Sequence, residues 1–266
     1  MRAIYLFIVL FLSGCVGTPS GRKPMTLNRF FDDPGVSRLA AAAAEGDVAQ
    51  VERLVQQGVD PNAIGNEGMS PLWWVFATSH NRAGMAALMR LGADPDYIPA
   101  GGRYSMLSAT MAGSKEQLTV RLAETLLAGG ANPNRRDERG NTPLNFALFG
   151  HASLEKVQML VRYGADIHTV DNCGKSLLWS ALAVRAHDVA KWLIEQGVDV
   201  HRMNKNGGTS AWIIHDALIN NLYSDWARTS ALELKVMLEA RGVKFPPPSP
   251  QDNQAKMVPK WEPCRL

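Results

Sequence analysis

A motif that begins with glycine and places an Asp or Asn two positions later recurs along the chain. Its copies begin at five glycines, spaced 34, 38, 34 and 33 residues apart: Gly58, Gly92, Gly130, Gly164 and Gly197. A degenerate sixth copy begins at Gly242. A fixed period in this range is typical of repeat proteins, in which each repeat contacts only its neighbours. The 266 residues can therefore form one array without dividing into separate cores.

A second motif follows each of the first five copies ten residues later and keeps the same period. Its copies begin at Gly68, Gly102, Gly140, Gly174 and Gly207. Two different motifs that share one period are hard to obtain by chance. The period therefore belongs to the fold.

One unit shows what each repeat predicts. Thr142 is a natural helix N-cap, and Pro143 suits the first helical turn, where its missing N–H would have no intrahelical partner. We expect a first helix over Leu144 to Phe149 and a second over about Leu154 to Arg162. Gly164 then supplies the left-handed residue that ends the second helix.

The ~33-residue period and the Gly-x-Thr-Pro-Leu start at Gly140 resemble the ankyrin-repeat family. The resemblance implies an all-α fold, an ankyrin-repeat α-solenoid of about six repeats with short hairpin loops, over residues 36–245. The first unit lacks a preceding hairpin, so we expect it to cap the array. Extra residues near Ser114-Lys115 and an insertion around Asn220 to Thr229 depart from the pattern and leave the boundaries there open.

The first fifteen residues have the pattern of an export signal. Arg2 supplies a positive start, and the apolar run from Ile4 to Leu12 is shorter than the ~20 residues of a transmembrane helix. The sequence Leu12-Ser13-Gly14-Cys15 resembles the bacterial lipobox, whose cysteine is acylated. The resemblance implies a lipoprotein signal peptide over residues 1–14 and a lipid on Cys15. An ordinary signal peptide or an uncleaved anchor is the alternative.

Three expectations complete the domain plan. Val16 replaces the Asp that retains such lipoproteins in the inner membrane, which implies the bacterial cell envelope, at the periplasmic face of the outer membrane. Residues 15–35 are rich in Gly, Pro, Ser and basic residues, which predicts a flexible tether after the lipidated Cys15. Residues 246–266 begin with a Pro-rich extended stretch and predict a loosely ordered tail.

The sequence contains no signature of catalysis. It has no nucleophile elbow, no His-Glu-x-x-His and no phosphate-binding P-loop. Its six histidines do not cluster, and several occupy turn positions. The net charge of +3 is too weak and too scattered to indicate nucleic-acid binding. We therefore expect no enzyme activity, cofactor, metal, nucleic acid or small-molecule substrate.

The cysteines leave a choice open. With Cys15 in the export segment, Cys173 and Cys264 remain, too few for a disulfide framework and without the spacing of a zinc motif. A bridge between them would suit an oxidising compartment. Two unpaired, solvent-facing thiols are the alternative.

One slot of the repeat, five residues after the second-motif glycine, is unusually aromatic. It holds Trp73, Leu107, Asn145, Trp179 and Trp212. The resemblance places this slot at the base of the inner helix. Three tryptophans there predict either a partly exposed aromatic row that binds a partner, or side chains that fill space between repeats.

The hairpin tips are the other candidate surface, because tips and inner helices form the partner-binding groove of ankyrin proteins. Together with Trp73, Trp179 and Trp212, the predicted partner-binding residues are those of the tips: Asn66, Glu67, Met69, Asp137, Glu138, Arg139, Asn141, Asp171, Asn172, Lys175, Lys205 and Asn206.

The combined features resemble the ankyrin lipoproteins that act as immunity proteins against type VI secretion lipase effectors. This resemblance implies a non-catalytic binder, monomeric apart from its partner, that blocks a secreted phospholipase effector. Two alternatives are an envelope ankyrin protein that supports a catalase or another enzyme, and a structural scaffold that only spaces envelope components.

Overall fold

The computed structural model describes residues 26–113, 116–149, 151–220, 222, 224–257 and 264. Within these ranges the secondary structure is helical, with two isolated β-bridges, Val170–Ser176 and Met203–Thr209, and no strand. The predicted signal peptide and Cys15 lie outside the described residues. The chain divides into two compact units, Met1–Asp137 and Glu138–Leu266, which we call unit 1 and unit 2.

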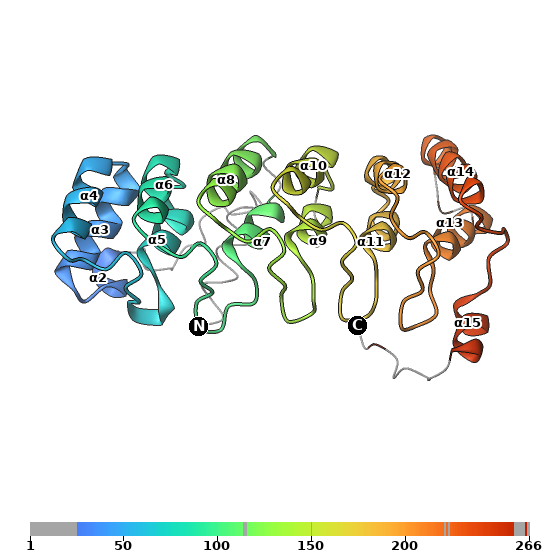
Figure 1. Ribbon diagram of the computed structural model, residues 1–266, viewed down its shortest axis with the longest axis horizontal. Helices are drawn as coiled ribbons and strands as arrows, with labels where there is room; N and C mark the ends of the chain where they lie inside the picture. Colours follow the sequence, from blue (N-terminus) through green and yellow to red (C-terminus); the bar gives the residue numbers. More distant parts are fainter. Residues whose placement is uncertain are drawn as a thin grey trace, which may run out of the picture. The chain divides into compact units, whose positions relative to one another are not determined.

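Unit 1 is a series of helical hairpins (Figure 1). Helices α3 and α4, α5 and α6, and α7 and α8 pair in turn, and α6 also packs on α3, α4 and α8. The helices are α2 (Leu27–Phe30), α3 (Pro34–Glu45), α4 (Val48–Gln56), α5 (Pro71–Thr78), α6 (Arg82–Arg90), α7 (Met106–Met111) and α8 (Glu116–Ala128), with the short 3-10 helix η1 (Asn66–Gly68).

Unit 2 continues the pattern with three more hairpins. In Figure 1, α9, α11 and α13 form one row of this unit, and α10, α12 and α14 form a second row beside it. Helix α11 packs on both α9 and α13, and α12 packs on both α10 and α14. The helices are α9 (Pro143–Leu148), α10 (Leu154–Arg162), α11 (Leu177–Ala183), α12 (His187–Glu195), α13 (Ser210–Ile219), α14 (Asp225–Ala240) and α15 (Pro250–Lys256).

Local sequence explains where these helices begin and end. The predicted second helix at Leu154–Arg162 is confirmed as α10, and Gly164 behind it is left-handed, with φ of 89°. The predicted first helix becomes α9, one residue earlier at each end. Asn145 explains its start, because its side-chain carbonyl accepts the Thr142 backbone N–H at 2.9 Å and the Thr142 hydroxyl at 3.2 Å.

The core of each unit lies between its stacked hairpins. In unit 2, Leu178, Val189, Leu193 and Ile214 are fully buried. A single hairpin could not bury these side chains, so each repeat depends on its neighbours.

The N-terminal boundary of the fold needs a correction. We predicted a flexible tether over residues 15–35, yet Leu27–Phe30 form α2, and Phe30 and Phe31 are buried. Their rings lie 5.7 and 6.3 Å from the Trp74 ring. Burial of the apolar area of these rings stabilises the segment, so the first repeat is covered by an added turn of helix.

The C-terminal segment also differs from the expected loose tail. Pro250–Lys256 form α15, which begins with a capping box between Ser249 and Asp252. The expected insertion around Asn220 to Thr229 is partly helical, because α14 begins at Asp225.

Candidate protein-binding surface

The aromatic slot splits into a buried residue and two accessible ones. Trp73 is 1% exposed, its indole N–H donates to the Tyr97 carbonyl oxygen at 2.9 Å, and its ring meets Phe76 edge-on at 5.3 Å. The prediction that Trp73 belongs to the partner-binding surface therefore needs correction. This side chain fills unit 1 and its only polar group is satisfied there. Leu107 and Asn145, at the same slot, are also buried.

Trp179 and Trp212 occupy the slot in unit 2 and are only partly buried. Each lies in the first turn of its helix, where the cap accepts its backbone N–H: the Ser176 hydroxyl accepts that of Trp179 at 3.1 Å, and the Thr209 hydroxyl accepts that of Trp212 at 3.2 Å. The two indoles occupy the same slot of their repeats. These repeats are neighbours, because α11 packs on α13.

Polar groups accompany both indoles. The Lys175 ammonium lies 4.7 Å from the centre of the Trp179 ring, a cation–π contact. The His215 ring lies 5.6 Å from the Trp212 ring. Trp179, Trp212 and Lys175 therefore define what we call the aromatic face of unit 2.

The residues of the first predicted tip, Asn66, Glu67 and Met69, make contacts within unit 1. Met69 is 3% exposed. The Glu67 carboxylate pairs with the Arg29 guanidinium at 2.7 Å. The Asn66 side chain donates to the Arg29 carbonyl oxygen at 3.1 Å and to Asp32 at 3.2 Å. These contacts hold α2, a role that the sequence did not suggest because residues 15–35 were expected to be a tether.

The next predicted tip falls at the boundary between the units. Asp137, half-buried, ends unit 1, and Glu138 begins unit 2. Glu138 and Arg139 are exposed, and Asn141 is half-buried.

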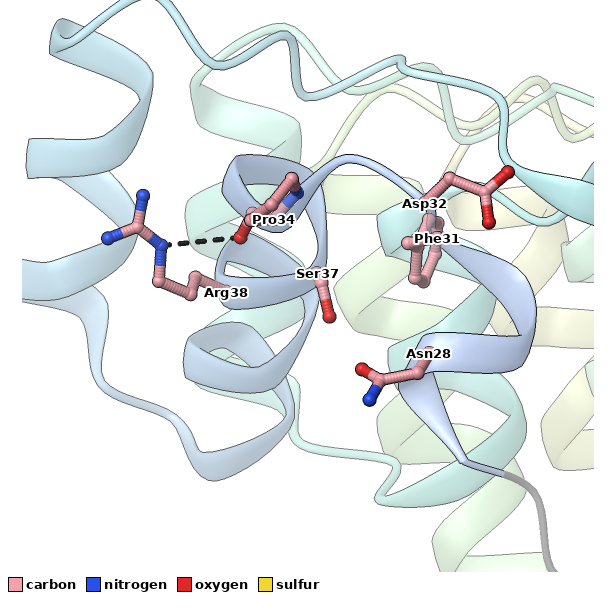
Figure 2. Close-up of a pocket in the computed structure, with 6 residues that line it drawn as sticks. All are labelled: Asn28, Phe31, Asp32, Pro34, Ser37 and Arg38. Carbon is pink, nitrogen blue, oxygen red and sulfur yellow. Dashed lines mark hydrogen bonds between the residues drawn. The ribbon is translucent and has the colours of Figure 1, made fainter.

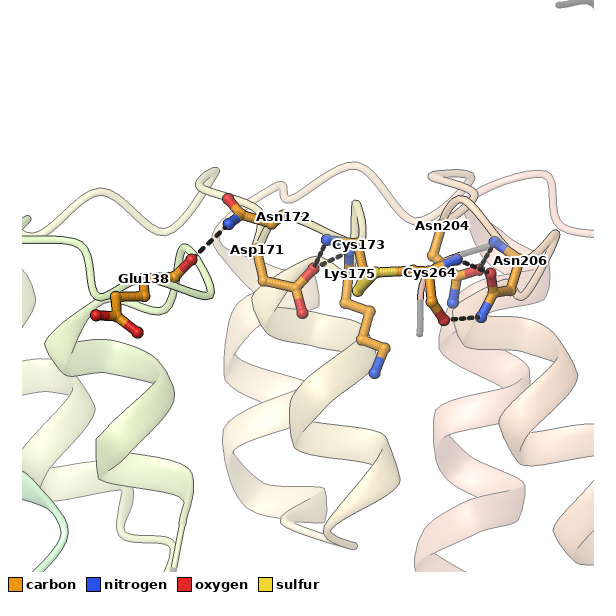
Figure 3. The surroundings of a disulfide bond; sticks show 8 residues. All are labelled: Glu138, Asp171, Asn172, Cys173, Lys175, Asn204, Asn206 and Cys264. Atoms are coloured by element: carbon orange, nitrogen blue, oxygen red, sulfur yellow. Dashed lines mark hydrogen bonds between the residues drawn. A yellow bond between two sulfur atoms is a disulfide. The ribbon is translucent and has the colours of Figure 1, made fainter. Parts of the chain in front are cut away.

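The tips of unit 2 are joined to one another (Figure 3). The Asn172 side chain donates to the Glu138 carbonyl oxygen at 2.9 Å, and the Asn172 backbone N–H donates to the Arg139 carbonyl oxygen at 2.9 Å. Within its own tip, the Asp171 carboxylate accepts the N–H groups of Cys173 at 2.9 Å and Lys175 at 2.8 Å. Asp171 is thus a turn-forming residue, whereas the Asn172 side chain is exposed.

The last tip is bound to the C-terminal segment. The Lys205 N–H donates to the Cys173 carbonyl oxygen at 2.9 Å. The Asn206 side chain bonds to the backbone of Cys264, and a disulfide joins Cys264 to Cys173. This settles the cysteine alternatives in favour of the bridge.

Burial shifts the pKa of three groups that lie away from the predicted surface. Burial raises the pKa of the Asp96 carboxyl, against the opposing hydrogen bond from the Asn132 backbone, and burial also raises the pKa of Tyr97. Burial lowers the pKa of His187, and the nearby charges of Lys191 and Arg185 lower it further.

A surface hollow of about 410 Å³ lies in unit 1 where α2 meets α3 (Figure 2). It is lined by Asn28, Phe31, Asp32, Pro34, Ser37 and Arg38. The Arg38 guanidinium donates to the Pro34 carbonyl oxygen at 3.2 Å. None of the predicted partner-binding residues lines the hollow.

In the part of the chain that the structure describes, no three His, Cys, Asp or Glu side chains are grouped so that they could hold a metal ion. None of the described helices is both long and apolar enough to cross a membrane.

Comparison with known proteins identifies the repeats. A family model for ankyrin repeats, covering three copies, matches residues 109–204. The solved ankyrin-repeat domain of Bcl-3 is similar to this chain with a TM-score of 0.62 and 22% identity, covering 81% of this chain and 90% of that one. An ankyrin-repeat domain from Acinetobacter baumannii gives a TM-score of 0.58 and 21% identity, covering 77% and 98%. The predicted ankyrin-repeat fold is confirmed.

Curated relatives share the repeats at low identity. A putative palmitoyltransferase of Danio rerio is 26% identical over 198 residues, which cover 73% of this chain and 30% of that protein. An ankyrin repeat domain-containing protein of Homo sapiens is 32% identical over 123 residues, covering 43% and 32%. The match with this chain therefore spans about a third of the length of these relatives.

Proposed function

We propose that this ankyrin-repeat protein is a non-catalytic binder of another protein, and that it engages its partner through the aromatic face of unit 2. The ankyrin fold itself points to protein binding, since it typically serves as an interaction scaffold. The observation that carries the more specific proposal is the pair of half-buried indoles, Trp179 and Trp212, on adjacent inner helices.

These indoles are well suited to binding because each already has a neighbouring side chain against its ring. The Lys175 ammonium lies over the Trp179 ring, and the His215 ring lies 5.6 Å from the Trp212 ring. A partner would therefore lose little side-chain entropy of this protein on binding. Tryptophan is also among the residues that contribute most when an interface is desolvated.

The exposed tip residues extend this surface. Glu138, Arg139 and Asn172 are exposed, and the hydrogen bonds from Asn172 fix the two tips relative to each other. Asp171 contributes by shaping its turn. We therefore expect the indoles to supply most of the affinity and the tips to supply specificity.

The test begins with a partner captured from envelope extracts by the lipidated full chain and then titrated against variants. The double variant Trp179→Ala/Trp212→Ala should weaken binding by at least ~30-fold, since hot-spot truncations cost about 2 kcal/mol or more. Tyr163→Ala removes an exposed aromatic elsewhere in unit 2 and is the matched control, expected to change the Kd by less than about twofold. Equal affinities for all three proteins would reject the aromatic face as the binding surface.

A finer proposal concerns location and partner. The lipobox-like Leu12-Ser13-Gly14-Cys15 supports a lipid-anchored protein of the bacterial envelope, at the periplasmic face of the outer membrane. Anchoring at that surface would raise the local concentration of a binder that blocks an incoming secreted phospholipase effector. The resemblance to immunity lipoproteins supports a lipase as the partner.

Two measurements test the finer proposal separately. Metabolic labelling with a fatty acid should mark the wild-type chain and leave Cys15→Ser unlabelled. If both proteins were labelled, the lipid would be attached to a residue other than Cys15. If neither were labelled, the chain would not be lipidated. An excess of the chain should abolish the activity of a phospholipase effector encoded beside it, and full lipase activity would reject the immunity role.

A further inference from the structure

The C-terminal segment returns to the tips of the last two repeats of unit 2. We call its described residues, 250–257 and 264, the strap. Helix α15 is its first point of attachment: the Asn253 side chain is buried and donates to the Gly207 carbonyl oxygen at 2.9 Å. Gly207 must be glycine for this approach, since a Cβ there would lie 2.3 Å from the Pro250 carbonyl oxygen and φ is 75°.

Cys264 is the second point of attachment and uses three bonds. Its backbone N–H donates to the Asn206 side-chain oxygen at 3.0 Å, and its carbonyl oxygen accepts from the Asn206 side-chain nitrogen at 3.5 Å. Its sulfur is bonded to Cys173, 91 residues earlier, with a Cα–Cα distance of 5.5 Å. Figure 3 shows Cys264 between the two tips, with Cys173 on one side and Asn206 on the other.

We propose that the Cys173–Cys264 disulfide is a thiol-sensitive latch: breaking it releases the strap from the tips of the last two repeats and leaves the repeats folded. A dithiol reductant would supply two electrons and two protons. The disulfide becomes two cysteine thiols, and the reductant becomes a cyclic disulfide. Both cysteines are partly exposed, so a small dithiol can reach the bond.

The strap depends on the covalent bond because its other contacts are few. Helix α15 has seven residues, well below the ~12–15 that an isolated helix needs to persist in water, and only Asn253 among them is buried. The hydrogen bonds between Asn206 and Cys264 lie at a partly exposed position, where water competes for them.

The repeats do not depend on the strap in the same way. Helices α11, α12, α13 and α14 pack on one another through buried aliphatic side chains, none of which belongs to the strap. Release should therefore be a local event within an intact unit 2.

Opening the latch would change the tip surface next to the aromatic face. The Asn206 amide would lose its peptide partner, and Cys173 lies two residues from Lys175, which rests on Trp179. An extended backbone of a partner could then take the place of Cys264 on Asn206. This consequence for partner binding rests on the proposed function, whereas the latch itself does not.

The test is hydrogen exchange with mass spectrometry on the oxidised full chain, before and after treatment with dithiothreitol. Amides in 204–208 and 251–256 should exchange at least tenfold faster after reduction, and those in α11 and α12 should not change. Unchanged exchange at the tips would show that the strap stays bound without the disulfide. If α11 and α12 also lost protection, the disulfide would be required for unit 2 to stay folded. Either result overturns the latch.

Variants separate the disulfide from other effects of the reductant. Cys264→Ser should exchange like the reduced protein and no longer respond to dithiothreitol, and Cys15→Ser should behave like the wild type. Alkylation followed by peptide mapping should modify Cys173 and Cys264 only after reduction. Modification without reductant would also overturn the proposal. No partner is used, so failure of the latch leaves the proposed function standing, and failure of partner binding leaves the latch standing.

Discussion

The indole N–H of Trp73 donates to the backbone carbonyl oxygen of Tyr97 at 2.9 Å, which joins the first helix of one hairpin to the loop that follows it. This bond and the ring of Phe76 hold Trp73 inside unit 1. Trp179 stands at the same repeat position in unit 2, half-buried beneath Lys175. One slot of the repeat thus serves two purposes, packing in one unit and display in the other.

This difference predicts opposite consequences for two equal truncations. Trp73→Ala should lower the free energy of unfolding of unit 1 by about 3–5 kcal/mol, because it empties a buried site and leaves the Tyr97 carbonyl without its donor. Trp179→Ala should cost about 1 kcal/mol or less. Urea unfolding followed by circular dichroism measures both, and similar losses would mean that the two indoles are equally buried.

Gly84 in α6 lies against the backbone of α3. A Cβ at this position would be 1.8 Å from the Ala43 carbonyl oxygen. Gly84→Ala should therefore destabilise unit 1 by about 1–3 kcal/mol through overpacking, although alanine is the better helix former by about 1 kcal/mol. A gain in unfolding free energy would show that α3 and α6 can separate freely. Ala86→Gly, at an exposed site of the same helix, is the control and should cost about 1 kcal/mol.

His187 predicts a dependence of stability on pH. Burial, with Lys191 and Arg185 nearby, holds its pKa below the ordinary value of about 6.5. Above that value both the folded and the unfolded chain carry a neutral imidazole, so protonation of His187 takes nothing from the free energy of unfolding. As the pH falls through about 6.5 and down to the lower pKa of the folded state, the unfolded chain takes up the proton first and stability is lost.

The measurement is a pair of urea titrations, at pH 7.5 and pH 5.0. The wild type should lose more unfolding free energy between these conditions than His187→Gln, which cannot take up a proton. If the two proteins lose the same amount, the pH dependence comes from other groups.

Helix α2 should stabilise unit 1 through its apolar side chain and not through its charge. Phe30→Ala empties a buried site against Trp74 and should cost about 3–5 kcal/mol. Arg29→Ala removes an exposed ion pair with Glu67 and should cost no more than about 1 kcal/mol. Urea unfolding of both variants decides whether the aromatic packing or the ion pair contributes more to the stability of unit 1. A larger loss for Arg29→Ala would mean that the ion pair, and not the aromatic packing, attaches α2.

The repeat architecture was predictable from the sequence because it depends on local, periodic signals. The glycines that end helices and the Ser or Thr caps that begin them act within a few residues, and the structure places α10 at the predicted bounds. The candidate surface was predictable only in part. The slot of Trp73, Trp179 and Trp212 is visible in the sequence, but exposure depends on which side chains from other repeats cover it.

Contacts between distant segments explain what the sequence did not reveal. No local signal marks Phe30 as a residue that packs on Trp74, 44 positions later, or Asn253 as the partner of Gly207, 46 positions earlier. The same holds for the choice between a bridge and two free thiols at Cys173 and Cys264.

The period, the bounds of α10 and the ankyrin-repeat fold follow from residue spacing, since capping and turn formation involve neighbours in the chain. Only folding in three dimensions decided which indoles remain accessible, that Phe30 and Phe31 join the core, and that the C-terminal segment is joined to the tips. Those outcomes depend on burial and on contacts between residues that are tens of positions apart. The stabilising free energy of such contacts arises only when the distant segments come together.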